Sequence, residues 1–135
     1  MTAMQRLALA CLIGMAGGCG SAASPATAPS TTTSPTSEGW SGVLAPGGAS
    51  SRSFTANAAG TISITLTGAG ATVGLGVGLP RTSGGGCRLG VTVNAAPGPT
   101  AQLTTQADAG SYCVQVFDLG SLSDPVPFAM TINHP

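Results

Sequence analysis

Apolar and polar residues alternate along most of the C-terminal part of the chain. The clearest case is 61–67, where Ile or Leu at every second position is separated by Thr or Ser. Segments 72–79, 112–116 and 128–132 repeat this pattern. Successive side chains of a strand point to opposite faces, so a period of two predicts strands with one buried face.

Weaker strands are predicted at 51–55, 89–93 and 101–105, and no segment after residue 18 has helical spacing. Turn-forming residues separate the predicted strands in six clusters, at 45–48, 57–60, 83–86, 96–99, 109–110 and 124–125. Short strands at regular intervals, each with one apolar face, predict an all-β fold. We expect a small antiparallel β-sandwich of about seven or eight strands over residues 39–135.

Segment 72–79 has glycine at every second position. Its aliphatic side chains are predicted to face the core and its glycines to line the opposite face: Val73, Leu75, Val77 and Leu79 on one side, Gly74, Gly76 and Gly78 on the other. A glycine face could accept a ligand or a partner sheet. It could equally be covered by the same domain, because glycine in a strand often marks a close backbone approach. We favour this second, structural interpretation.

The first 18 residues have the layout of an export signal. One charge at Arg6 precedes an apolar run over 7–15, and small residues follow at 16–18. The run is too short to span a bilayer, which takes about 20 apolar residues. Cys19 directly after the small residues resembles the lipobox of bacterial lipoproteins. This resemblance implies that residues 1–18 are removed and that Cys19 carries lipid such as palmitate.

The lipobox resemblance implies an anchored protein of the bacterial cell envelope, facing the periplasm or the exterior, with the membrane as a partner through Cys19. The family prefers Leu three residues before the cysteine, where this chain has Ala16. The alternative is simple secretion, with cleavage after Ala23 or Ala28. Residues 19–38 follow as a predicted disordered linker, because 20–37 holds only Gly, Ser, Ala, Thr and Pro and cannot bury enough surface to order itself.

Cysteine usage supports export. Cys11 would leave with the signal and Cys19 would carry lipid, so Cys87 and Cys113 remain as a predicted disulfide in an oxidising compartment. Such a bridge stabilises the folded state by about 3–4 kcal/mol. The alternative is two unrelated buried thiols. A structural metal site needs more ligands than two cysteines and one histidine supply.

Few charged residues follow the signal: three arginines, four acids and no lysine. Without a basic patch, a nucleic-acid partner is not expected. A hydrolase would have to use His134, which lies next to the chain end, where residues fray, and we expect it to face solvent. Asp118 and Asp124 bracket a loop and are candidates for binding calcium, but aspartate is also a common turn residue and their spacing matches no calcium loop. We therefore predict no catalytic residues, no cofactor and no metal.

Four stretches together resemble the bacterial pre-peptidase C-terminal domain, a jelly-roll-like β-sandwich of secreted proteins. They are 42–54, with its Gly-x-Leu and turn before Phe54, 59–66, 109–116 and 128–132. The glycine-striped strand departs from that family, and the cysteine pair is not a general feature of it. The resemblance implies a non-catalytic appendage that serves binding or secretion.

These observations predict a non-catalytic, lipid-anchored envelope domain that acts as a binding or assembly module, with an envelope glycan or protein as its partner. Its loops or its glycine-striped strand would form the binding surface, because loops carry function on rigid sandwiches. Two alternatives stay open. One is a small secreted or envelope hydrolase using Asp118, Asp124 or His134, and the other is a purely structural spacer.

Overall fold

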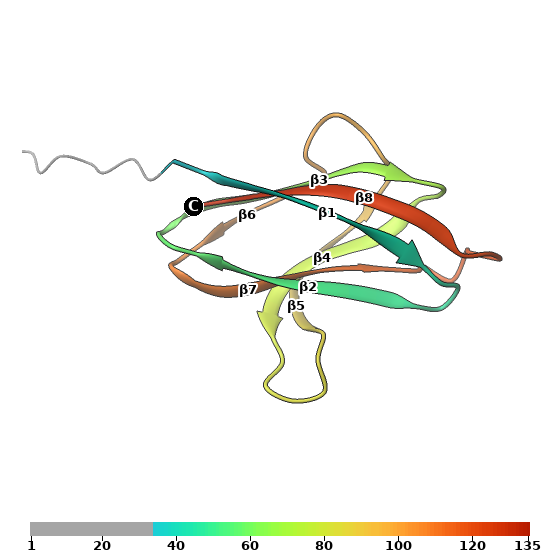
Figure 1. Cartoon of the computed structure of the whole chain (residues 1–135), viewed down its shortest axis with the longest axis horizontal. Helices are drawn as coiled ribbons and strands as arrows, with labels where there is room; N and C mark the ends of the chain where they lie inside the picture. The colour runs from blue at the N-terminus through green and yellow to red at the C-terminus, as the bar shows by residue number, and fades with distance from the viewer. Residues whose placement is uncertain (1–33) are drawn as a thin grey trace, which may run out of the picture. The chain divides into compact units, whose positions relative to one another are not determined.

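Eight strands and no helix make up residues 34–135, the part of the chain that the computed structural model describes. The strands are β1 (Thr36–Leu44), β2 (Ala49–Ala56), β3 (Gly60–Ala69), β4 (Val73–Pro80), β5 (Cys87–Ala95), β6 (Leu103–Ala107), β7 (Gly110–Phe117) and β8 (Val126–His134). They form two four-stranded antiparallel sheets, which confirms the predicted β-sandwich (Figure 1).

The strand order is β1-β8-β3-β6 in one sheet and β2-β7-β4-β5 in the other. The first strand pairs with the last, the second with the seventh, the third with the sixth and the fourth with the fifth. This nested pairing is that of a long hairpin ribbon rolled into two layers, which is the jelly-roll arrangement. β1 and β6 are the edges of one sheet, and β2 and β5 are the edges of the other.

The core lies between the sheets and consists of the side chains that the alternation placed on one face. Ile62, Ile64 and Leu66 of β3 are fully buried. Residues from both sheets complete it: Leu44, Phe54, Val73, Leu75, Val77, Ala95, Leu103, Val114, Val116, Phe128, Met130 and Ile132. Burying one such aliphatic or aromatic side chain stabilises the fold by about 1.5–3 kcal/mol. The core is therefore the main source of stability of this sandwich.

β1 is a strand that the sequence pattern did not predict. The strand starts at Thr36, inside the stretch 19–38 expected to be linker, and pairs with β8 from Thr36 opposite His134 to Leu44 opposite Val126. It has little alternation to detect, because only two large side chains fix it to the core. Trp40 packs edge-on against Phe128, with ring centroids 5.0 Å apart, and Leu44 is buried.

Leu79 is not part of the core, contrary to the sequence prediction, and is 54% exposed. The pairing of β4 with β7 ends at Gly78 opposite Cys113, so Leu79 has no paired residue on the β7 side. The β4–β5 ladder also shifts register between Val77 and Gly78. β6 differs more modestly, since it occupies 103–107 instead of 101–105.

The predicted signal, Cys19 and most of the predicted linker lie outside the described residues. Within residues 34–135, no helix is long and apolar enough to cross a membrane.

Candidate functional site

The glycine-striped strand is covered by its own neighbours. A Cβ on Gly74 would run into the ring of Phe117 from β7. A Cβ on Gly76 would lie 2.9 Å from both terminal methyl carbons of Leu89 on β5. These glycines therefore make room for side chains of the same sheet, and they do not form an open face for a ligand. This agrees with the structural interpretation favoured from the sequence.

At Gly78 the backbone itself is the neighbour. A Cβ there would run into the carbonyl group of Arg88 and the Cα of Leu89. This is also where the β4–β5 ladder shifts register. The two strands thus come into close contact at the point where they leave the sheet to form the β4–β5 hairpin.

A disulfide lies at the base of this hairpin, and it confirms the predicted Cys87–Cys113 pair. Cys87 opens β5 and Cys113 lies on β7, so the bridge joins the two strands that flank β4. Their Cα atoms are 5.9 Å apart, and both side chains are buried. The start of β5 is thereby fixed covalently to the middle of the sheet.

The loop from Arg81 to Gly86 closes the hairpin and projects from the two sheets (Figure 1). The backbone N–H of Arg81 donates to the carbonyl of Gly86 at 3.2 Å, and Arg81 Nε donates to the carbonyl of Cys87 at 3.3 Å. The three glycines at 84, 85 and 86 have φ values of 80°, 65° and 82°. Side-chain-bearing residues rarely adopt this left-handed backbone, so the glycine run sets the shape of the turn.

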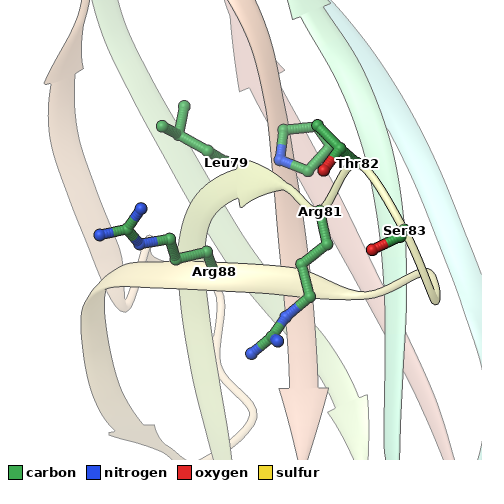
Figure 2. Close-up of a pocket in the computed structure, with 6 residues that line it drawn as sticks. Leu79, Arg81, Thr82, Ser83 and Arg88 are labelled. Atoms are coloured by element: carbon green, nitrogen blue, oxygen red, sulfur yellow. The ribbon is translucent and has the colours of Figure 1, made fainter.

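An open cavity of about 320 Å³ lies against this hairpin (Figure 2). We call it the hairpin pocket, and its lining comprises apolar, hydroxyl and guanidinium side chains: Leu79, Pro80, Arg81, Thr82, Ser83 and Arg88. Figure 2 shows the two arginine side chains extended in different directions, Arg88 from β5 and Arg81 from the loop that follows β4. Both ion pairs found among residues 34–135 involve Glu38, so neither pocket arginine has a carboxylate partner within this range.

His134 is buried, and the expectation that it faces solvent is wrong. It is 2% exposed, its ring lies 4.9 Å from that of Phe54, and its Nε2 is 3.2 Å from Glu38 Oε1. The other carboxylate oxygen of Glu38 accepts from Arg52 Nη2 at 3.2 Å. We call Glu38, Arg52 and His134 the edge cluster, because Glu38 and Arg52 lie on the neighbouring edge strands β1 and β2 of the two sheets. The chain end does not fray here because β1 pairs with β8 up to His134.

Asp118 organises a loop. Its Oδ1 accepts from the backbone N–H groups of Gly120, Ser121 and Leu122 at 2.9–3.2 Å, and its Oδ2 accepts from that of Gly47 at 2.8 Å. The hydrogen bond from Gly47, followed by those from the loop, holds the pKa of the Asp118 carboxyl below its usual range. Asp118 therefore ties the β7–β8 loop to the β1–β2 turn.

Asp124 accepts a hydrogen bond from the hydroxyl of its neighbour Ser123 at 3.0 Å. Residues 34–135 contain no group of three or more His, Cys, Asp or Glu side chains arranged to hold a metal ion. The two aspartates considered for calcium are thus not gathered with a further ligand of these types.

The two pocket arginines were not among the candidate residues predicted from the sequence. One signal could have found them, since residues 39–107 contain no Asp or Glu, and Arg81 and Arg88 lie within this stretch on either side of the three-glycine run. A loop shaped by glycine that carries cations far in sequence from any acid is a recognisable candidate for binding.

No protein-family model matches this chain, and a search of the curated proteins finds no match.

Proposed function

We propose that the chain is a non-catalytic binding domain, anchored in the bacterial cell envelope by lipid on Cys19, with the hairpin pocket as its binding surface. The lipobox-like sequence ending at Cys19 supports the anchor. The strand pattern that resembles the pre-peptidase C-terminal domain, usually a non-catalytic appendage, supports the binding role. The predicted linker would let the sandwich reach a partner beyond the membrane surface.

The observation that carries the proposal is the hairpin itself. It is fastened to the sheet by a disulfide and projects from the sandwich with an open pocket. Loops held on a rigid scaffold are where binding residues concentrate. A purely structural spacer has no need of a pocket that exposes Leu79 beside two arginines.

The contacts of the candidate catalytic side chains favour a binding domain over a hydrolase. A catalytic histidine must be free to exchange a proton with a nucleophile. His134 has Glu38 at one ring nitrogen and the carbonyl of Pro135, 3.4 Å away, at the other. Both oxygens of Asp118 are occupied by backbone N–H groups.

The anchor is tested by the intact mass of the protein expressed in a bacterium with its own signal. We expect a mass that begins at Cys19 with added diacylglyceryl and acyl groups. Cys19→Ala should abolish this modification, whereas Cys11→Ala, which changes the other cysteine of the N-terminal segment, should leave it intact. An unlipidated product beginning near Ser24 or Pro29 would contradict the anchor and support simple secretion.

The binding role is tested by sedimenting the mature protein with isolated bacterial cell walls stripped of other proteins. Thr82→Trp fills the hairpin pocket without altering a charge, and we expect it to reduce the sedimented fraction. Thr104→Trp places the same side chain at an exposed position on β6 and should have no effect. Absence of wild-type binding, or equal binding by both variants, would contradict the proposed surface.

A further inference from the structure

We infer that the hairpin pocket binds an anionic group, a carboxylate or a phosphate, carried by a glycan-type polymer of the cell envelope. The inference rests on the proposed function and names its ligand class. Its starting point is charge: Arg81 and Arg88 line the same cavity, and the carboxylate partners available within residues 34–135 lie elsewhere. Two positive charges on one open pocket attract a negative ligand.

The donor geometry suits a carboxylate or a phosphate. A guanidinium presents a planar fork of N–H donors that matches either group in a bidentate way. Arg81 Nε is already used on the carbonyl of Cys87, which fixes the direction of that side chain and leaves its terminal nitrogens available. Thr82 and Ser83 add hydroxyl groups to the lining of the pocket.

The lining argues against a neutral sugar as the main determinant. Neutral sugars are usually recognised by stacking on an aromatic ring, and the hairpin pocket has none among its lining residues. Leu79 and Pro80 instead offer a small apolar wall for the carbon skeleton that carries the anion. The ligand is therefore expected to be recognised through its charge and to rest on this wall.

The number of cations argues against a lipid surface. Anionic membranes are recognised by clusters of about four to eight basic residues. The hairpin pocket has two, and the third arginine among residues 34–135, Arg52, is paired with Glu38 in the edge cluster. A polymer fits better, because repeated anionic groups can rebind to one small pocket.

The hairpin is also built to hold the arginines in place before a ligand arrives. The disulfide fixes Cys87, the residue before Arg88, and the backbone N–H of Arg81 is bonded across the loop to Gly86. Such preorganisation reduces the entropy lost on binding. The two guanidinium groups thus start from anchored backbone positions on both arms of the hairpin.

The test compares the mature protein with the double variant Arg81→Gln/Arg88→Gln in titrations against three polymers. The probes are polygalacturonate, which carries carboxylates, poly(glycerol phosphate), which carries phosphates, and dextran, which is neutral. We expect the wild-type protein to bind at least one anionic probe. The affinity of the double variant for that probe should be lower by about tenfold or more, as for loss of a charge-assisted contact. Binding should weaken as salt is raised. The anionic probe that binds identifies the group.

Arg52→Gln is the matched control, because it removes the same charge from the edge cluster and should leave affinity unchanged. The inference is overturned if the wild-type protein binds dextran as tightly as the anionic probes, or if Arg52→Gln loses as much affinity as the double variant. It is also overturned if the protein binds none of the polymers but binds vesicles containing phosphatidylglycerol in a parallel titration. It is also overturned, with the proposed function intact, if Thr82→Trp abolishes sedimentation with cell walls while Arg81→Gln/Arg88→Gln does not. If the wild-type protein fails to sediment at all, the proposed function fails first.

Discussion

The edge cluster and the hairpin pocket use arginine in opposite ways. Arg52 of the edge cluster donates to Glu38, which also contacts the buried ring of His134, so its charge is neutralised between the two sheets. Arg81 and Arg88 line an open cavity away from that carboxylate. The arginine matched with a carboxylate joins two strands of the fold, whereas the two arginines without such a partner in residues 34–135 line the pocket that we propose as a binding surface.

The glycines also form two groups, one inside the sheet and one in the β4–β5 loop. Gly74, Gly76 and Gly78 of β4 leave space for neighbouring side chains and backbone within the sheet. Gly84, Gly85 and Gly86 have left-handed backbones, and nothing lies within 4 Å of where their Cβ atoms would be. The first group packs the sandwich, and the second shapes the turn of the proposed binding surface.

Removing the disulfide should have the largest effect, because it lowers the stability of the domain and also releases the base of the hairpin. For Cys87→Ala/Cys113→Ala we expect a loss of about 3 kcal/mol in the free energy of unfolding, measured by urea denaturation. Affinity for the anionic probe should fall as well, because the base of the hairpin is released. Wild-type protein reduced under the same conditions is the control, and unchanged stability after reduction would refute the prediction.

Removing the His134 ring should have the next largest effect and should act on the edge cluster alone. His134→Ala deletes a buried ring that packs on Phe54 and leaves Glu38 with one partner, so we expect a loss of about 2 kcal/mol. His134→Phe keeps a ring without the contact to Glu38 and should recover part of the loss. Probe affinity should be unchanged in both variants, and a matching fall in affinity would show that the two regions are coupled.

The sequence predicted the parts of the fold that depend on local pattern. Alternation identifies β3, β7 and β8 and their buried faces, because a period of two is a property of each strand by itself. β1 was not predicted, since it depends on pairing with β8, far away in the chain. Leu79 was misplaced for a related reason, because alternation continues along β4 after the neighbouring strand has stopped pairing.

The candidate site was harder to predict. The number of cysteines left after the signal and the oxidising compartment predicted the disulfide, but the role of a charged residue depends on its partner in space. Glu38 and His134 are 96 residues apart in sequence and 3.2 Å apart in the fold. Arg52 and Arg88 both lie in the stretch 39–107 that holds no acid, so the sequence does not show which of them is paired. The fold shows it, because it brings Glu38 of β1 and Arg52 of β2 together from the edges of the two sheets.

Breaking the Arg52–Glu38 pair should have a small effect on stability. The side chains are 43% and 30% exposed, and ion pairs of this kind contribute about 1 kcal/mol or less. We therefore expect Arg52→Gln to lower the free energy of unfolding by less than His134→Ala does. A larger loss in urea denaturation would mean that the arginine, and not the histidine ring, holds the edge cluster together.

Asp118 extends the comparison to a charge that is held by backbone N–H groups, and we expect the smallest effect here, read from how stability changes as the pH is lowered. Its pKa lies below the ordinary value of 3.8, chiefly because of the hydrogen bond from Gly47. The carboxylate therefore contributes stability that is fully present above that value and is lost as the pH falls through the lower folded-state pKa.

In Asp118→Asn this acid-dependent loss should shrink, because the variant side chain does not titrate. Asp124→Asn removes a carboxylate that, among residues 34–135, accepts only from Ser123. This variant should therefore keep the wild-type dependence of stability on pH. An Asp118→Asn profile identical to wild type in acid-unfolding measurements would mean that the loop is held by its backbone alone, and that internal neutralisation of charge matters only in the edge cluster.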